Sequence, residues 1–337
     1  MKIIKLIGIA TGVLLLAACA GQQKNTDLYH WGNYSDVVYS HYNEPGDFAK
    51  QEQSLNQIIS QSKELNKPVA PGVYGHLGLA LLKQGKSGEA KAAFQQEQSL
   101  YPESTQFIQF LQRKNKGKND EKIISCSNRY DFTCWLCGQK VPEYDYTALK
   151  ESKPKSILVV MPVNNSVDAK ADTSVLARAS YQLAEKGYYV YPVALVDETF
   201  KQNGLIDGAA IRSASTKKIH DIFGADSILY LNVNEYGTSY QVFDSVTKVS
   251  LEGKLVDLKT GKTLWEGTGS HSKGSTNSND GALVALVKAV VNQVIDTSKD
   301  KGYEVSAFAM SNLVHLGKNG GLLVGPRHPS YNLSDKK

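Results

Sequence analysis

The hydrophobic and polar positions divide the chain into two parts with different periods. Residues 28–112 lack the alternation of strands and are rich in Gln, Ala, Leu and Lys, a composition that favours helices. From Ser156 onward, short runs of branched apolar residues alternate with segments of helical spacing. This order predicts an α + α/β chain, in which a helical module is followed by a mixed-sheet α/β domain.

The spacing between Val73 and Glu103 matches that of a tetratricopeptide repeat. Gly78 would lie where two antiparallel helices touch, Phe94 would fill the space between them, and residues 84–86 would form the turn. The matching positions are Tyr74, Leu77, Gly78, Leu81, Ala90, Phe94 and Pro102. Upstream helices, one within residues 29–41 and one over 53–65, would form a degenerate partner repeat, because a lone repeat cannot bury its apolar side.

The aromatic residues before this repeat have two interpretations. Trp31 and Tyr34, with Tyr39 and Tyr42, could line a peptide-binding groove. They could instead be core side chains of the helix pair, which their large apolar rings favour.

The α/β domain is expected to contain six strands and four helices. The expected strands are 157–163, 188–194, 227–235, 240–243, 248–258 and 262–269, with a hairpin turn at 259–262. The expected helices are 171–186, 196–203, 215–223 and 282–297. Residues 270–281 are rich in Ser, Asn and Gly, which predicts a mobile loop, and Pro326 and Arg327 would dock the tail, residues 331–337.

Residues 113–144 have no clear periodicity and are predicted to be a linker. Within them, residues 136–140 resemble the start of a second mature lipoprotein that lacks its signal. We therefore hypothesise that two adjacent lipoprotein genes have joined in one reading frame. Cys126, Cys134 and Cys137 also lie here, but neither a thioredoxin-like context nor a second ligand pair accompanies them, which argues against a redox or zinc function.

The amino-terminal residues have the pattern of a lipoprotein signal peptide. Lys2 and Lys5 precede an apolar run that ends in Leu16, Ala17, Ala18 and Cys19. The run is shorter than the roughly 20 residues that a membrane-spanning helix needs. We therefore expect cleavage of residues 1–18 and attachment of diacylglycerol to Cys19. No Asp follows Cys19, which favours the outer membrane, with the protein on its periplasmic face.

Composition and charge fit an exported globular protein. Cleavage would leave 319 residues and lower the net charge from +5 to +3. This small charge, with the expected location, argues against a nucleic-acid partner.

The sequence predicts no catalytic residue, metal site or cofactor. Its seven histidines are scattered, and the Gly-x-Ser-x-Gly pattern of hydrolases is absent. Asn164, Asn165 and Ser166 follow the first strand, at an edge where polar groups commonly meet ligands. They could equally satisfy their own backbone. Asp197, with its two following residues, would cap the short helix.

Several motifs of the α/β domain occur together in a known family. They lie at 145–148, 156–160, 162–166, 191–200, 223–226, 235–240 and 325–327. Together they resemble the GNA-series outer-membrane lipoprotein family over residues 145–330. The resemblance implies the fold of the TolB amino-terminal domain, which the curli-secretion protein CsgG shares. Residues 19–112 resemble a small family of uncharacterised bacterial lipoproteins that starts with Leu-Tyr-x-Trp-Gly-x-Tyr, present here as Leu28 to Tyr34.

The resemblances imply a non-catalytic scaffold or accessory factor of the cell envelope. A lipid would tether it, and its partners would be envelope proteins, a CsgG-like secretion lipoprotein or a cell-wall synthase among them; self-association into an oligomer stays open. The alternative is a small-ligand-binding protein or enzyme that uses the polar edge near Asn164, Asn165, Ser166 and Asp197.

Overall fold

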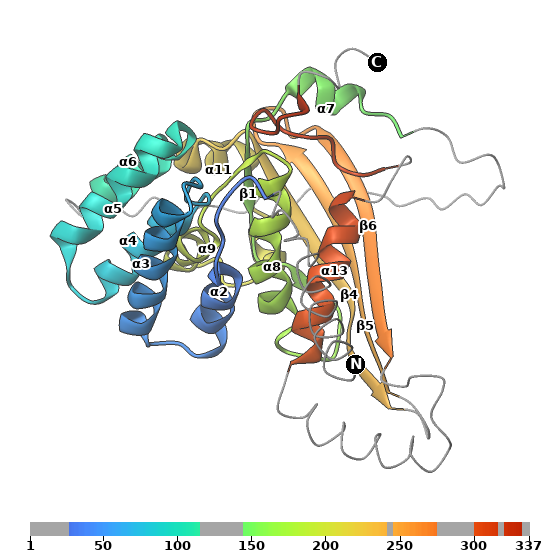
Figure 1. The fold of residues 1–337 in the computed structure, drawn as a ribbon. Coiled ribbons are helices and arrows are strands. Elements are labelled where there is room, and N and C mark those ends of the chain that lie inside the picture. The colour runs from blue at the N-terminus through green and yellow to red at the C-terminus, as the bar shows by residue number, and fades with distance from the viewer. Residues whose placement is uncertain (1–26, 115–143, 241–244, 275–299, 316–319, 332–337) are drawn as a thin grey trace, which may run out of the picture.

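The computed structural model describes residues 27–114, 144–240, 245–274, 300–315 and 320–331 (Figure 1). Several predictions lie outside these residues: the signal peptide with Cys19, the three linker cysteines, and the helix expected at 282–297. Of the helices that the structure describes, none is long and apolar enough to cross a membrane.

The amino-terminal part is helical, as predicted. It contains α2 (Tyr34–Asn43), α3 (Phe48–Glu64), α4 (Val73–Lys83), α5 (Ser87–Leu100), the 3-10 helix η2 (Pro102–Ser104) and α6 (Thr105–Lys114). The predicted contact between α4 and α5 is present, because a Cβ on Gly78 would lie 2.4 Å from the ring of Phe94. The helix expected within residues 29–41 begins only at Tyr34, so Trp31 precedes it.

The second part is an α/β domain with a mixed sheet. Its helices are α7 (Thr147–Ser152), α8 (Ala171–Glu185), α9 (Val193–Gln202), α10 (Gly208–Arg212), α11 (Thr216–Phe223) and α13 (Lys301–His315). Its strands are β1 (Ser156–Val159), β2 (Val163–Asn164), β3 (Tyr189–Val190), β4 (Ser227–Tyr240), β5 (Ser245–Asp257) and β6 (Thr263–Gly274). The order is β3-β1-β4-β5-β6, with β2 paired to β4. β1 pairs in parallel with β3 and β4, and β2 pairs in parallel with β4, whereas β5 pairs in antiparallel fashion with β4 and β6.

Several expected elements have different bounds in the structure. The strands expected at 227–235 and 240–243 are one strand, β4, as far as Tyr240, and residues 241–244 lie outside the described residues. The helix expected at 196–203 begins at Val193. The strand expected at 157–163 is divided into β1 and β2. The strand expected at 188–194 ends at Val190, because Pro192 stands at the N-cap of α9 and its fixed φ suits a helix start. β6 continues to Gly274, so the loop expected from residue 270 is wrong for its first five residues. Their partner is the start of β5, where Val246 pairs with Gly274 and Ser250 with Ser270.

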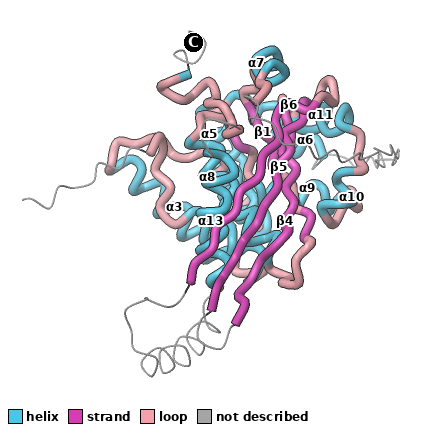
Figure 2. The backbone as a smooth tube through the Cα atoms, turned by 90° about the vertical axis from the view of Figure 1, so that its right-hand side faces the viewer, coloured by secondary structure: helices cyan, strands magenta, loops and turns pink. Residues whose placement is uncertain are grey.

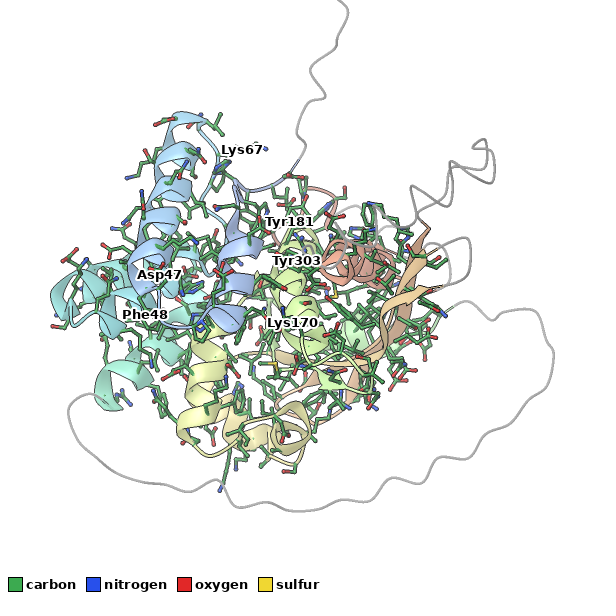
Figure 3. All side chains as sticks on the ribbon, turned by 90° about the horizontal axis from the view of Figure 1, so that it is seen from below. Asp47, Phe48, Lys67, Lys170, Tyr181 and Tyr303 are labelled. Carbon is green, nitrogen blue, oxygen red and sulfur yellow. The ribbon has the colours of Figure 1, made fainter. Side chains whose placement is uncertain are left out.

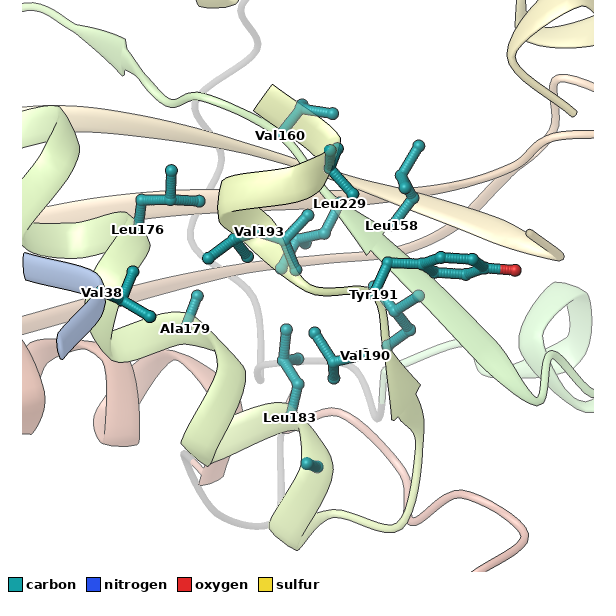
Figure 4. Close-up of a cluster of buried hydrophobic side chains, with 14 of the residues drawn as sticks. Val38, Leu158, Val160, Leu176, Ala179, Leu183, Val190, Tyr191, Val193 and Leu229 are labelled. Carbon is teal, nitrogen blue, oxygen red and sulfur yellow. The ribbon is translucent and has the colours of Figure 1, made fainter. Parts of the chain in front are cut away.

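The elements form three layers. α8 and α13 lie on one face of the sheet, and the amino-terminal helices pack on their outer side (Figure 1). Figure 2 shows β4, β5 and β6 in front of these helices, and no described helix lies over that face of the strands. Buried apolar side chains of both parts form a single cluster. Figure 4 shows how Val38 of α2 lies beside Leu176 and Ala179 of α8.

Candidate functional site

The amino-terminal helices and the α/β domain meet across a face that is rich in buried polar contacts. We call it the module interface, formed by residues 27–107 on one side and by α8, β3, α9, α11, α13 and residues 320–331 on the other. Tyr181 of α8 and Tyr303 of α13 lie along it, on the side of the α/β domain that meets the amino-terminal helices (Figure 3). Tyr303 donates to Asp36 of α2 over 2.8 Å, and its ring lies 4.2 Å from that of Tyr39.

Glu185 holds the segment that precedes α2. Its carboxylate accepts the backbone N–H groups of Leu28 at 2.7 Å and Tyr29 at 3.3 Å, and the indole N–H of Trp31 at 2.7 Å. The ring of Trp31 packs edge-on against Tyr181, with centroids 5.2 Å apart. Burial raises the pKa of the Glu185 carboxyl, and the hydrogen bonds from Trp31 and the backbone offset part of this rise. One carboxylate therefore joins the end of α8 to three donors of the helical part.

Glu97 of α5 is a fully buried carboxylate at the same interface. It accepts from the backbone N–H groups of Gly72 at 2.8 Å and Gly75 at 3.1 Å, at the amino-terminal end of α4. Tyr189 of β3 donates its hydroxyl to the same carboxylate over 3.0 Å. Burial raises the pKa of Glu97 to about 7, although these hydrogen bonds lower it. The positive end of the α4 dipole favours an anion at this place.

Glycines let the two parts approach closely at the start of α9. A Cβ on Gly75 would lie 2.4 Å from Cγ of Pro192, which real Cβ atoms essentially never show. Gly72 has a φ of +87°, and a Cβ there would lie 3.2 Å from Cα of Pro192. The backbone of α4 therefore lies directly against Pro192, which only glycine allows at these two positions.

The carboxyl-terminal segment also reaches the helical part. Arg327 donates two hydrogen bonds to Glu103, at 2.5 and 2.8 Å, in the bidentate geometry typical of strong ion pairs. Arg327 therefore holds its own segment on η2. The tail that it was expected to dock lies, from residue 332 onward, outside the described residues. Nearby, Gln106 of α6 donates to the carbonyl groups of His220 and Asp221 in α11, and the Phe107 ring lies 4.6 Å from that of Phe223.

Asp197 lies inside α9 rather than at its start, so the expected capping role is wrong. The helix begins four residues earlier, at Val193, after Pro192. Asp197 is 5% exposed and pairs with Lys201 at 2.7 Å, one helical turn along. Burial raises its pKa, and Lys201 lowers it in part. Its second oxygen, like the Gln51 amide nitrogen and His76 Nδ1, has no hydrogen-bond partner among the described residues.

Trp31 and Tyr34 are interface and core residues. They are 7% and 1% exposed, and the Tyr34 hydroxyl donates to the carbonyl of Gly72 over 3.2 Å. Such burial leaves their rings no accessible surface for a peptide. The structure therefore agrees with the core interpretation, and it extends it, because the Trp31 ring contacts the α/β domain.

Asn164, Asn165 and Ser166 lie at the end of β2 and serve largely local contacts. The Asn164 side chain accepts from the backbone N–H and the hydroxyl of Ser166, and donates to the carbonyl of Asp168. Asn165 donates to Asn234 of β4 over 3.2 Å. An open depression of about 640 Å³ follows, lined by 167–169, 235–239, Val246 and Lys248. No described hydrogen bond brings Asp197 to these residues.

The module interface was missed by sequence reasoning, although traces of it were visible. Leu28, Tyr29 and Trp31 matched the first residues of a known family, but the sequence did not show that they bind Glu185. Glu97 and Glu185 look like ordinary polar positions of amphipathic helices, since sequence alone does not show which helix faces another domain. Among the described residues, no group of three His, Cys, Asp or Glu side chains could hold a metal ion.

Two family models match the chain in separate segments. The one described as "Putative lipoprotein GNA1162-like" matches residues 144–327, more than half of the chain. The chain belongs to the GNA1162-like lipoprotein family. The second model, a domain of unknown function named DUF4810, matches residues 28–111, which are the helical part.

Relatives of the GNA1162-like part are found in Neisseria meningitidis. The lipoprotein NMB1124/NMB1162 of a serogroup B strain is 53% identical over 189 residues, which are 56% of this chain and 88% of the relative. A crystal structure of lipoprotein GNA1162 is 52% identical over 42% of this chain and 99% of its own, with a TM-score of 0.36. The LpoB carboxy-terminal domain from Escherichia coli is 21% identical over 36% of this chain and 85% of its own, with a TM-score of 0.27.

Proposed function

We propose that this GNA1162-like protein is a non-catalytic scaffold or accessory factor of an envelope assembly, anchored by a lipid on Cys19 to the periplasmic face of the outer membrane. The lipoprotein family and the lipobox support the anchor. In this proposal the helical part is of the tetratricopeptide type and the α/β domain of the TolB amino-terminal type. Its partner is an envelope protein such as a CsgG-like secretion lipoprotein.

The observation that carries the scaffold role is the face of β4, β5 and β6 over which no described helix lies (Figure 2). Along β5, exposed Lys248, Glu252 and Lys254 alternate with buried Val249 and Leu251, so one face is core and the other polar. The other face of the sheet is covered by α8 and α13 (Figure 1). The polar sheet face is therefore the broad surface that this body offers to an envelope partner.

A small-ligand-binding function is the second candidate. The depression of about 640 Å³ beside Asn164–Ser166 supports it, since binding sites are commonly concave. Asp197, the other residue expected to serve such a site, is buried against Lys201 instead.

Affinity purification of the acylated protein from membranes tests the scaffold role. We expect an envelope protein to co-purify, and the variant Lys254→Glu on the sheet face to reduce its recovery at least about tenfold, as loss of a charge-complementary contact does. Lys91→Glu, at an exposed position of α5, is the matched control and should leave recovery unchanged. Recovery of no stable partner, together with saturable binding of a soluble ligand, would favour the second candidate instead.

A further inference from the structure

The α/β domain carries a preformed docking surface for a separate helical protein. We propose that the face of α8, β3, α9 and Arg327 binds a DUF4810-type protein in relatives that lack residues 28–111, and that the module interface of this chain is that complex joined in one polypeptide. This inference goes beyond the scaffold role and does not depend on the lipid anchor.

The sizes of the relatives point to two separable units. The 189 residues matched by the meningococcal lipoprotein are 88% of that protein, and the crystallised GNA1162 chain is covered to 99% by 42% of this chain. The remaining 12% of the first relative is too short to hold a second module of 84 residues. The helical part has a family model of its own, at residues 28–111. Each half is thus a unit that family comparison recognises by itself.

The covered face is too apolar to be a free surface. Tyr189, Tyr191 and Phe223 are 0% exposed, and each contacts residues of the helical part: Glu97, Glu103 and Phe107 respectively. Without that part, these rings and Pro192 would form an exposed apolar patch. Contiguous patches of this kind on soluble proteins mark interaction sites.

The polar contacts across the face are complementary in both directions. The helical part supplies Glu97 and Glu103 as acceptors for Tyr189 and Arg327. The α/β domain supplies Glu185 as an acceptor for Trp31. Tyr39 likewise donates to Asp300 over 2.7 Å. Glu103 and Glu185 are partly exposed, whereas Glu97 is buried with its hydrogen bonds satisfied. An apolar centre with a more polar rim is the anatomy of a protein–protein interface.

The chemistry of the partner follows from these contacts. It presents an indole and a backbone segment to Glu185, as Trp31 and Leu28 do here. It also brings a glycine-containing helix start against Pro192, as Gly75 does. A covalent link between the two units adds only effective concentration to such an interface.

Cleavage of the full chain tests the proposal. A specific protease site is placed within residues 115–143, the purified protein is cut, and the products pass over a size-exclusion column at micromolar concentration. We expect the two halves to elute together at the volume of the uncut protein. Elution of two separate folded halves would overturn the proposal.

A pair of substitutions links the result to the interface. Glu185→Ala removes the three hydrogen bonds to Leu28, Tyr29 and Trp31, and should raise the dissociation constant of the cut halves ~10- to 100-fold. Glu266→Ala, at an exposed position of β6, is the matched control. Circular dichroism of each uncut variant establishes that it is folded. Equal dissociation constants for the two folded variants would overturn the proposal, whereas loss of an envelope partner in the membrane purification would not affect it.

Discussion

Glu97 links the stability of the fold to pH. Its pKa is about 7 in the folded protein against an ordinary value of 4.5, so the folded state binds the proton more tightly than the unfolded state. Its contribution to the free energy of unfolding is therefore largest below pH 4.5 and falls as the pH rises toward 7. The shift corresponds to roughly 3 kcal/mol across this window.

Glu97→Gln should remove this pH dependence. Relative to the variant, the wild-type protein should lose up to roughly 3 kcal/mol of stability between pH 4.5 and 7, as measured by urea unfolding at a series of pH values. Buried His41 and His76 titrate with lowered pKa values and act in the opposite direction, but they are present in both proteins and cancel in the difference. Parallel curves for the two proteins would show that Glu97 does not carry a raised pKa.

Gly78 is the residue at which sequence reasoning was most specific. Gly78→Ala would place a methyl group 2.4 Å from the ring of Phe94, and such overpacking should cost about 1–3 kcal/mol of stability. Gly88→Ala is the matched control, because nothing lies within 4 Å of its Cβ position. It should stabilise α5 by up to about 1 kcal/mol. Thermal unfolding compares the two, and a neutral Gly78→Ala would argue against the packing of α4 on α5.

The contact between Gly78 and Phe94 was predictable because the two residues lie only 16 positions apart, on the consecutive helices α4 and α5. Glu97 was not predictable in the same way. Its partners Gly72 and Tyr189 lie 25 and 92 residues away, and only the folded chain brings them to one carboxylate.

At the scale of elements, the carboxyl-terminal segment is held by one strong pair. Arg327→Ala removes both hydrogen bonds to Glu103 and should lower the free energy of unfolding by about 1–3 kcal/mol, as expected for partly buried charged groups. Arg327→Lys should recover only part of this loss, since a lysine cannot form the bidentate geometry.

The matched control is Lys254→Ala, which breaks an exposed pair with Glu266 on the sheet face and should cost well under 1 kcal/mol. Urea unfolding measures all three variants. An Arg327→Ala protein as stable as the control would mean that residues 320–331 are not held on the helical part.

Helices were predicted well where glycines mark their ends, whereas the strands were predicted less well. β4 is one strand over residues 227–240, where two separate strands were expected. α8 and α11 lie within one residue of their expected bounds, because Gly187 and Gly224 follow them and end helices. The apolar run from Tyr188 looked like a single strand, yet only two residues pair with β1 before Pro192 starts α9. Polar Ser270–Gly274 looked like a loop, but β5 provides hydrogen-bonding partners that composition does not reveal.

At the scale of the whole molecule, a helical part followed by an α/β part was correctly expected, but the contact between them was not. The sequence placed a linker between parts that each looked self-contained. The structure instead joins them through one apolar cluster and the carboxylates Glu97, Glu103 and Glu185. Hydrophobic periodicity shows which face of a helix is buried, but it does not show whether its own module or another one buries it.

The whole account of function depends on the anchor at Cys19, and mass spectrometry of the amino-terminal peptide from membrane-extracted protein tests it most directly. We predict that Cys19 is the first residue and carries a diacylglycerol group. A chain that retains residues 1–18, or an unmodified Cys19, would contradict the proposal of a lipid-anchored scaffold.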